Sequence, residues 1–205
     1  ADGKLIVHIL NLTALNLATG ETLWQVRLPE SWGTPQVGRI GDAAIICTAA
    51  GDIVRASDGK VLASKLCRLE YGDPILADGI IYYPQNGGKA FKLPAAADEP
   101  FTPELLWETA VNKDRYYAGS VLHEGIIYCV TQASVFSAVD ATNGQVIYEQ
   151  RLGLPPAMYP AVTLAGNLLY VSSEKGMTVL VKPGRQYEEA GRLTLDLAEA
   201  ALRAG

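Results

Sequence analysis

The sequence contains few of the residues on which most catalytic and nucleic-acid-binding sites depend. It has two histidines and three cysteines in 205 residues, and its 17 Lys and Arg residues form no basic block. With a net charge of −5, the chain lacks the clustered positive surface that binds phosphate backbones, so we expect no nucleic acid partner. No apolar run reaches the ~18 residues that a transmembrane helix requires, and we predict none.

The histidines and cysteines are also too scattered for a common metal or redox site. His8 ends an apolar stretch and His123 stands in a turn, with no second histidine at metal-ligand spacing. Cys47 and Cys129 occupy equivalent places in two apolar runs, and Cys67 falls in another expected strand. We interpret all three as buried structural thiols, and we predict no metal site and no catalytic residue.

A short apolar strand pattern, by contrast, returns five times along the chain. The copies follow turns of Gly, Asp, Glu or Asn and read LIVH, AIIC, IIYY, IIYC and LLYV. Their last residues fall at positions 8, 47, 83, 129 and 171, which gives intervals of 39, 36, 46 and 42. Five copies with a period near 41 residues indicate a chain built from structural repeats.

Each repeat has the pattern of four antiparallel strands, because runs rich in Val, Ile, Leu and Tyr alternate with connections rich in Gly, Asp and Asn. This predicts an all-β fold, a β-propeller of four-stranded blades, over residues 1–195. The first blade lacks its first strand, and residues 196–205 form a tail whose composition favours a short helix. The expected blades span residues 2–30, 34–66, 72–110, 118–152 and 159–195.

The clearest repeated motif is the hairpin between the third and fourth strands of a blade. It reads ALNLATGETLW near the start of the chain and returns as AVDATNGQVIY. We expect Gly20 to supply the positive φ that the tight turn requires. Trp24, Trp107 and Tyr148 stand at one place in the fourth strand, where we expect an aromatic ring to pack against a neighbouring blade.

These hairpins, and the turn-and-strand units before them, resemble the repeats of the pyrroloquinoline-quinone-like (PQQ-like) β-propeller family over roughly residues 2–195. The family includes quinoprotein alcohol dehydrogenases and the propeller lipoprotein of bacterial outer-membrane protein assembly. The resemblance therefore implies a bacterial protein outside the cytoplasm, periplasmic or secreted. Such propellers usually close with seven or eight blades, so we expect part of a longer ring. Closure at five blades would need residues 193–197 or the tail to supply the missing strand.

The resemblance leaves more than one function open. The dehydrogenases of the family hold PQQ and calcium with adjacent cysteines, a Trp floor and carboxylates, and this chain has no adjacent cysteines. We therefore favour the non-enzymatic branch, a binding or scaffold module without a cofactor. The alternative is part of a PQQ- and calcium-dependent dehydrogenase whose cofactor residues lie outside this chain. A carbohydrate-binding propeller is a third hypothesis, since aromatic rings also stack on sugars.

The loops that lead into the first strands of the blades are rich in aromatic residues. In a propeller these connections lie on one face, around the mouth of the central channel. Aromatic and arginine side chains together are typical of recognition surfaces, so we predict that a protein or another macromolecule binds this channel face. In the alternative, the rings only pack between blades and cap the channel. The candidate residues are Trp32, Arg68, Tyr71, Arg115, Tyr116, Tyr117 and Tyr159.

Overall fold

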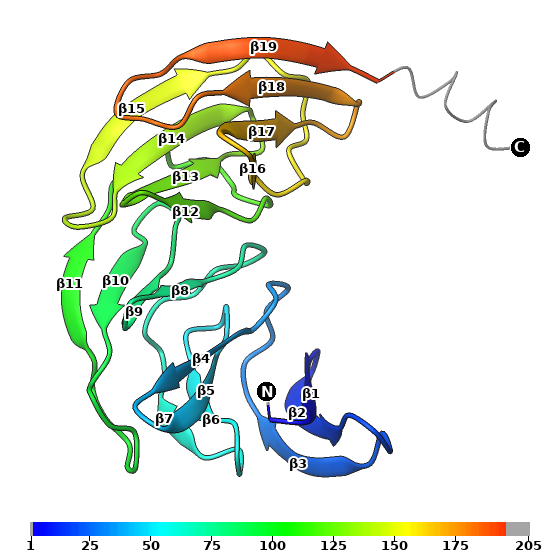
Figure 1. The fold of residues 1–205 in the computed structure, drawn as a ribbon, viewed down its shortest axis with the longest axis vertical. Helices are drawn as coiled ribbons and strands as arrows, with labels where there is room; N and C mark the ends of the chain where they lie inside the picture. The colour runs from blue at the N-terminus through cyan, green and yellow to red at the C-terminus, as the bar shows by residue number, and fades with distance from the viewer. Residues whose placement is uncertain (1, 196–205) are drawn as a thin grey trace, which may run out of the picture. The chain divides into compact units, whose positions relative to one another are not determined.

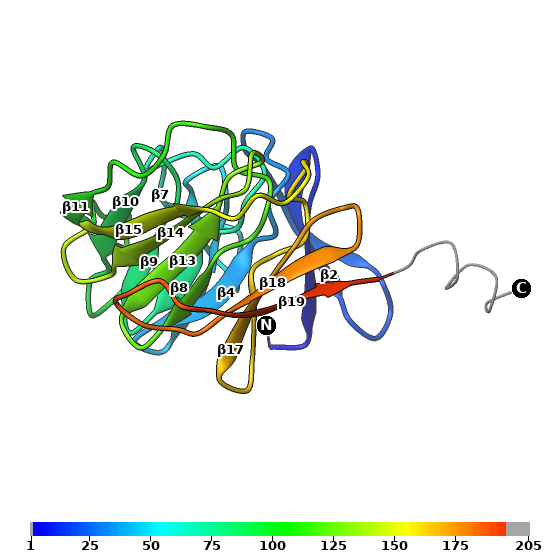
Figure 2. The same ribbon diagram turned by 90° about the horizontal axis from the view of Figure 1, so that it is seen from above.

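A computed structural model describes residues 2–195, and these form five antiparallel sheets without a helix (Figures 1 and 2). The chain divides into two compact units, residues 1–108 and residues 109–205. The first unit holds three sheets and the second holds two. The predicted helix in the tail, residues 196–205, lies outside the described residues.

In the first unit, the strands of each sheet pair in the order of the chain. The first sheet contains β1 (Lys4–His8), β2 (Asn11–Asn16) and β3 (Thr22–Arg27). The second contains β4 (Gln36–Ile40), β5 (Ala43–Cys47), β6 (Ile53–Arg55) and β7 (Val61–Ala63). The third contains β8 (Ile75–Ala77), β9 (Ile80–Tyr82), β10 (Lys89–Lys92) and β11 (Glu104–Glu108). Within the described residues β1 pairs only with β2, so the first sheet lacks a first strand, as predicted.

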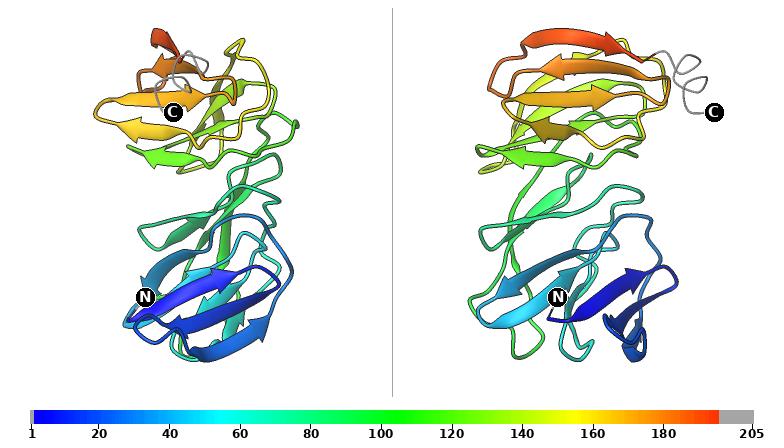
Figure 3. Two further views of the ribbon diagram at one scale, coloured as in Figure 1. Left: turned by 90° about the vertical axis from the view of Figure 1, so that its right-hand side faces the viewer. Right: turned by 45° about the vertical axis from the view of Figure 1, so that its right-hand side comes forward.

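The second unit repeats the same antiparallel order (Figure 3). Its first sheet contains β12 (Val121–His123), β13 (Ile126–Val130), β14 (Val135–Asp140) and β15 (Val146–Arg151). Its second contains β16 (Thr163–Ala165), β17 (Leu168–Ser172), β18 (Met177–Val181) and β19 (Glu189–Thr194). A four-stranded antiparallel meander that recurs about every 40 residues is the unit from which β-propellers are built, and each sheet is hereafter called a blade.

Tight two-residue turns join the first and second strands of the blades. Asp78 and Gly79 have φ angles of 49° and 74°, and Glu124 and Gly125 have φ angles of 47° and 74°. Positive φ at both central residues is the mark of a type I′ turn, whose twist matches the right-handed twist of the paired strands. The acidic residue and glycine of the repeated sequence pattern therefore form the hairpin turn of the blade.

A β-bulge recurs at one place in the hairpin between the third and fourth strands. In the first blade, Leu15 pairs with Thr22 and Ala14 pairs with Trp24, so Leu23 is the extra residue. The extra residues of the other blades are Leu62, Leu106, Ile147 and Ala190. A bulge increases the local twist of the strand pair and redirects the residue that follows it. The aromatic residues that follow it are Trp24, Trp107 and Tyr148.

Trp24 packs between the first two blades, as predicted. Its indole Nε1 donates a hydrogen bond to the backbone carbonyl oxygen of Ala56 in the second blade, with an N···O distance of 3.1 Å. The ring lies so close to Gly59 that a Cβ atom on this glycine would stand 2.8 Å from Cε3 of the indole. Tyr148 has the same place in the second unit, where its ring centroid lies 6.0 Å from that of Tyr187 in the next blade.

The three cysteines are free thiols. Cys47 in β5 and Cys129 in β13 are fully buried, and burial raises the pKa of both thiols to about 12. They therefore stay protonated at neutral pH, and their interpretation as structural thiols is confirmed. Cys67 was expected in a strand, and this was wrong, because β7 ends at Ala63 and Cys67 follows in the loop.

An ion pair joins the two blades of the second unit. Asp140, at the end of β14, is buried and accepts hydrogen bonds from the hydroxyl and the backbone N–H of Thr142, at 2.6 and 3.0 Å. Its other carboxylate oxygen accepts a hydrogen bond from Nη1 of Arg185 in the next blade, at 2.8 Å. The hydrogen bonds from Thr142, together with Arg185, hold the pKa of the Asp140 carboxyl below its usual range.

We predict that Asp140→Asn lowers the free energy of unfolding at pH 7 by about 1–2 kcal/mol, because charge-assisted hydrogen bonds are lost. The folded-state pKa of Asp140 is lowered, so its stabilisation is present above the unfolded pKa of about 4 and lost as pH falls through the folded value. Urea midpoints of the two proteins should therefore differ at pH 7 and converge as the pH falls through the folded-state pKa of Asp140. Glu124→Gln, at an exposed turn, is the control for the loss of one surface charge. An equal difference between wild type and Asp140→Asn at every pH would contradict this role.

Candidate functional site

Two kinds of loop lie together at one end of the strands: the loop between the second and third strands of a blade, and the connections between successive blades. Hydrogen bonds join them. The backbone N–H of Leu69 donates to the carbonyl of Ala49 at 2.8 Å, and that of Gln132 donates to the carbonyl of Arg115 at 2.7 Å. We call these segments the loop face of each unit. They are residues 9–10, 28–35, 48–52, 64–74 and 83–88 in the first unit, and residues 109–120, 131–134, 152–162 and 173–176 in the second.

Three of the predicted site residues meet on the loop face of the second unit. The rings of Tyr117 and Tyr159 lie with their centroids 5.0 Å apart and their planes inclined at 50°. Nη1 of Arg115 donates a hydrogen bond to the hydroxyl oxygen of Tyr117 at 3.1 Å, and Cζ of Arg115 lies 5.8 Å from the centroid of that ring. Tyr159 comes from the next connection along the chain and is 54% exposed. We call Arg115, Tyr117 and Tyr159 the tyrosine cluster.

Tyr116 does not belong to this surface. It is only 8% exposed, and its hydroxyl donates a hydrogen bond to the backbone carbonyl of Asn112 at 2.8 Å. Burial raises the pKa of the phenol well above its ordinary value. The expectation that Tyr116 contributes to a binding face is therefore corrected, because in this extended segment its side chain points inward while those of its two neighbours do not.

The first unit carries the other three predicted residues on its loop face. Trp32 is 78% exposed, Arg68 is exposed and Tyr71 is half-buried. The two connections that carry them run side by side, because the backbone N–H of Trp32 donates to the carbonyl of Glu70 at 3.2 Å. The next residue, Gly33, approaches the second connection closely, so that a Cβ atom there would stand 2.1 Å from the carbonyl oxygen of Gly72.

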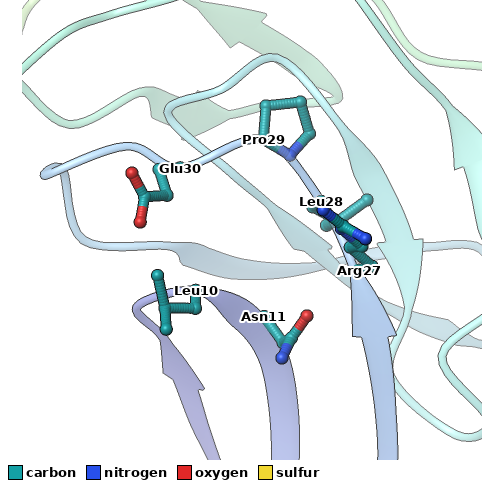
Figure 4. A pocket seen from close by; sticks show the side chains of 6 residues that line it. All are labelled: Leu10, Asn11, Arg27, Leu28, Pro29 and Glu30. Atoms are coloured by element: carbon teal, nitrogen blue, oxygen red, sulfur yellow. The ribbon is translucent and has the colours of Figure 1, made fainter.

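The loop face of the first blade contains two adjoining hollows that sequence reasoning missed. Glu30 contributes to both of them. The first, of about 700 Å³, is lined by Leu10, Asn11, Arg27, Leu28, Pro29 and Glu30 (Figure 4). The second, of about 260 Å³, is lined by His8, Ile9, Glu30, Ser31 and Trp32. The available signal was the pair Ile9–Leu10, two large apolar residues in a loop where turn residues are expected.

A comparable hollow, of about 760 Å³, lies in the second unit. It also lies on the loop face, between the two blades of the unit, and its wall is mostly small and apolar. It is lined by Gln132, Ala133, Ser134, Arg151, Gly153, Leu154, Pro155, Pro156 and Met177. The hollows described in both units thus lie at the strand ends where the aromatic residues were predicted.

The described residues do not form the donor set that a quinone and calcium require. Within residues 2–195, no three or more His, Cys, Asp or Glu side chains gather in a way that could hold a metal ion. The buried thiols Cys47 and Cys129 belong to different blades and are both protonated at neutral pH. These residues therefore do not fit PQQ or calcium.

The fold and the arrangement of its loops define this protein as a β-propeller, which confirms the predicted fold class. No protein-family model matches the sequence, and no curated protein matches it. Several solved propellers match its structure. BamB from Moraxella catarrhalis is 17% identical, with a TM-score of 0.66 over 95% of this chain and 61% of that chain.

Two further propellers are similar at the same level. The C-terminal WD40 domain of Sif2 is 13% identical, with a TM-score of 0.66 over 95% of this chain and 56% of that chain. The β-propeller domain of Cps50 (Swd1) from Myceliophteria thermophila is 11% identical, with a TM-score of 0.64 over 96% of this chain and 69% of that chain. The chain thus spans 61% of the BamB structure and 56% of the Sif2 domain. Identities this low establish the fold alone.

In the part of the chain that the structure describes, no helix has the length and the apolar character needed to cross a bilayer.

Proposed function

We propose that this chain is a non-catalytic propeller module that binds a protein partner through its loop face. The observation that carries the proposal is the tyrosine cluster, in which Arg115, Tyr117 and Tyr159 come from two successive connections and form one preassembled surface. On the resemblance of its repeats to the PQQ-like family, we further propose that it works outside the cytoplasm of a bacterium, in the periplasm or as a secreted protein.

The composition of the cluster supports protein binding for a physical reason. Tyrosine offers a large contact area with few rotatable bonds to immobilise, and both tyrosine and arginine are enriched at the energetically important positions of protein interfaces. Here the Arg115 hydrogen bond and the contact between the two tyrosine rings already order the side chains. Part of the entropy cost of association is therefore met before the partner arrives, which favours binding.

Site-specific photo-crosslinking tests the proposal. We predict that the chain with p-benzoylphenylalanine in place of Tyr159 forms a discrete adduct with a partner protein in extract from the source organism. The same group in place of Val146, which is partly exposed at the start of β15, at the opposite end of the strands, should form none. Arg115→Ala should lower the adduct yield at position 159 about tenfold, the effect expected for an interface hot spot of ~1.4 kcal/mol.

The control for chain integrity is the thermal midpoint of each variant, which should change little because the exposed side chains of position 159 and Arg115 lie outside the core. Equal adducts at positions 159 and 146, or an adduct at 159 that Arg115→Ala leaves unchanged, would refute loop-face recognition.

A further inference from the structure

The smaller hollow of the first blade has the features of a binding pocket. It lies where the loop between β1 and β2 faces the connection between β3 and β4, and its volume is about 260 Å³. His8, the last residue of β1, and Ile9, in the loop that follows, form one side, and the other loop contributes Glu30, Ser31 and Trp32. We call this the first-blade pocket. All five residues belong to the first unit.

Two side chains of the first-blade pocket carry buried polar atoms: Ser31, which is itself buried, and His8, which is half-buried. Ser31 is only 6% exposed, and its hydroxyl oxygen makes no hydrogen bond there. Both ring nitrogens of His8 are also buried; the Pro29 carbonyl can accept from one of them, which leaves the other as an unsatisfied acceptor. A buried polar group left unpaired costs about 1–3 kcal/mol, and native proteins keep few of them. A polar ligand group in the pocket would satisfy both side chains at once.

The charge of the first-blade pocket is negative. Glu30 is exposed and makes no ion pair within residues 2–195. Burial lowers the pKa of His8, an effect that the nearby Pro29 carbonyl only partly opposes, so the imidazole is neutral at pH 7. In the adjoining larger hollow, the side chain of Arg27 lies on the side away from the Glu30 carboxylate (Figure 4). The Glu30 carboxylate therefore gives the first-blade pocket its negative charge.

Three large apolar side chains stand exposed around this carboxylate. Trp32 is in the pocket wall, Ile9 lies beside it, and Leu10 lines the larger hollow. Exposed apolar residues that gather around a concave site mark recognition surfaces. The face of an indole ring attracts cations, and Trp is the strongest aromatic residue in this respect. Aliphatic residues such as Ile9 and Leu10 offer nothing to sugar hydroxyls, so the surroundings favour a peptide over a carbohydrate.

We propose that the first-blade pocket binds a Lys or Arg side chain of a partner's peptide segment, whose flanking apolar residues contact Ile9 and Leu10. The cation lies against the Trp32 ring and donates hydrogen bonds to the Glu30 carboxylate, the Ser31 hydroxyl and the neutral His8 imidazole. A Lys ammonium has three donors and an Arg guanidinium has five, so either can satisfy these acceptors. The inference rests on the proposed binding function and specifies the chemistry of one contact within it.

The test is a titration of the chain with short peptides, followed by nuclear magnetic resonance of the indole N–H groups. The chain has three tryptophans, so Trp24 and Trp107 serve as internal references for Trp32. The probes are acetyl-Leu-Lys-Leu-amide, its Arg and Gln counterparts, and the acidic acetyl-Leu-Glu-Leu-amide. We expect the basic peptides to shift the Trp32 signal saturably, with a dissociation constant at least tenfold lower than that of the Gln peptide.

Matched variants separate the pocket from general attraction to an acidic protein. Glu30→Gln should weaken binding of the Lys peptide about tenfold, or ~1.4 kcal/mol, and Ser31→Ala should weaken it several-fold. Glu104→Gln, at an exposed position in β11, removes the same charge elsewhere and should change nothing. The unshifted signals of Trp24 and Trp107 verify that each variant is folded.

Several outcomes would overturn the inference. They are no saturable shift of Trp32, equal affinity for the acidic peptide, or equal effects of Glu30→Gln and Glu104→Gln. A shift of Trp32 by maltose or N-acetylglucosamine, but not by the basic peptides, would assign the pocket to carbohydrate instead. Failure here is distinguishable from failure of the proposed function, because the adduct at position 159 would then persist in the Glu30→Gln variant.

Discussion

Trp24→Ala is expected to lower the free energy of unfolding by about 3 kcal/mol and the thermal midpoint by about 6–12 °C. The indole fills the space between the first two blades, contacts Gly59 and donates its N–H to the Ala56 carbonyl. Removing it leaves a cavity against a cluster of buried residues that includes Leu12, Ile46 and Val54. The loss is placed at the lower end of the range for Trp→Ala because the ring is only partly buried. Circular dichroism during heating measures it.

Two variants act as controls for Trp24→Ala. Trp32→Ala removes the same side chain from a site that is 78% exposed, so its effect on stability should stay within about 0.5 kcal/mol. Trp24→Phe keeps an aromatic ring and loses the hydrogen bond to Ala56, so it should cost less than Trp24→Ala. If Trp24→Ala and Trp32→Ala melted at the same temperature, the packing role assigned to Trp24 would be wrong.

Gly33→Ala is expected to lower the free energy of unfolding by about 2–3 kcal/mol, the cost of forcing extra volume into a packed site. The added Cβ would stand 2.1 Å from the Gly72 carbonyl oxygen and 2.7 Å from the Ala49 Cβ. The first of these atoms belongs to the backbone and the second to a short side chain, and neither can rotate away. The connection that carries Trp32 must therefore move from the connection that carries Arg68 and Tyr71, and the thermal midpoint should fall by about 10 °C.

The matched control for Gly33→Ala is Gly191→Ala. Gly191 also lies outside the left-handed region, and a Cβ there would meet its nearest neighbour, the Leu180 side chain, at an ordinary 3.9 Å. Its thermal midpoint should stay within a few degrees of wild type. Gly33→Ala should also move the Trp32 indole resonance, since the adjacent loop is displaced. A Gly33→Ala protein with wild-type midpoint and resonance would show that the two connections are not in close contact.

Some features of the fold follow from short stretches of sequence and were predicted from them. The turn of ALNLATGETLW needs a left-handed residue, and Gly20 has a φ angle of 76°. Strands such as β13 and β14 were recognisable because their residues are apolar and β-branched or aromatic between turn residues. The β-bulge beside Trp24 was not predicted, because a bulge depends on how two strands pair and these bulges share no particular residue type.

The candidate site was predicted only in part, for a similar reason. The connections were recognisable because they are rich in aromatic residues. Tyr116 and Tyr117, however, are the same residue type at adjacent positions, so the sequence does not show which of them is buried. Their difference arises because the Tyr116 hydroxyl finds the Asn112 carbonyl inside the blade, whereas Tyr117 meets Tyr159, more than 40 residues away. The first-blade pocket was missed altogether. It exists only where two loops, separated in sequence by the β2–β3 hairpin, come together around Ser31.

The all-β class, the repeat of about 41 residues and the hairpin turns follow from the amino-acid sequence alone. These depend on alternation of side chains along a strand and on the left-handed conformations of glycine, which neighbouring residues decide. The tertiary fold, by contrast, sets which loop side chains meet, which are buried and where Glu30, Ser31 and Trp32 form a pocket. Such contacts join residues that are distant in the chain, and the packing of strands and blades sets them.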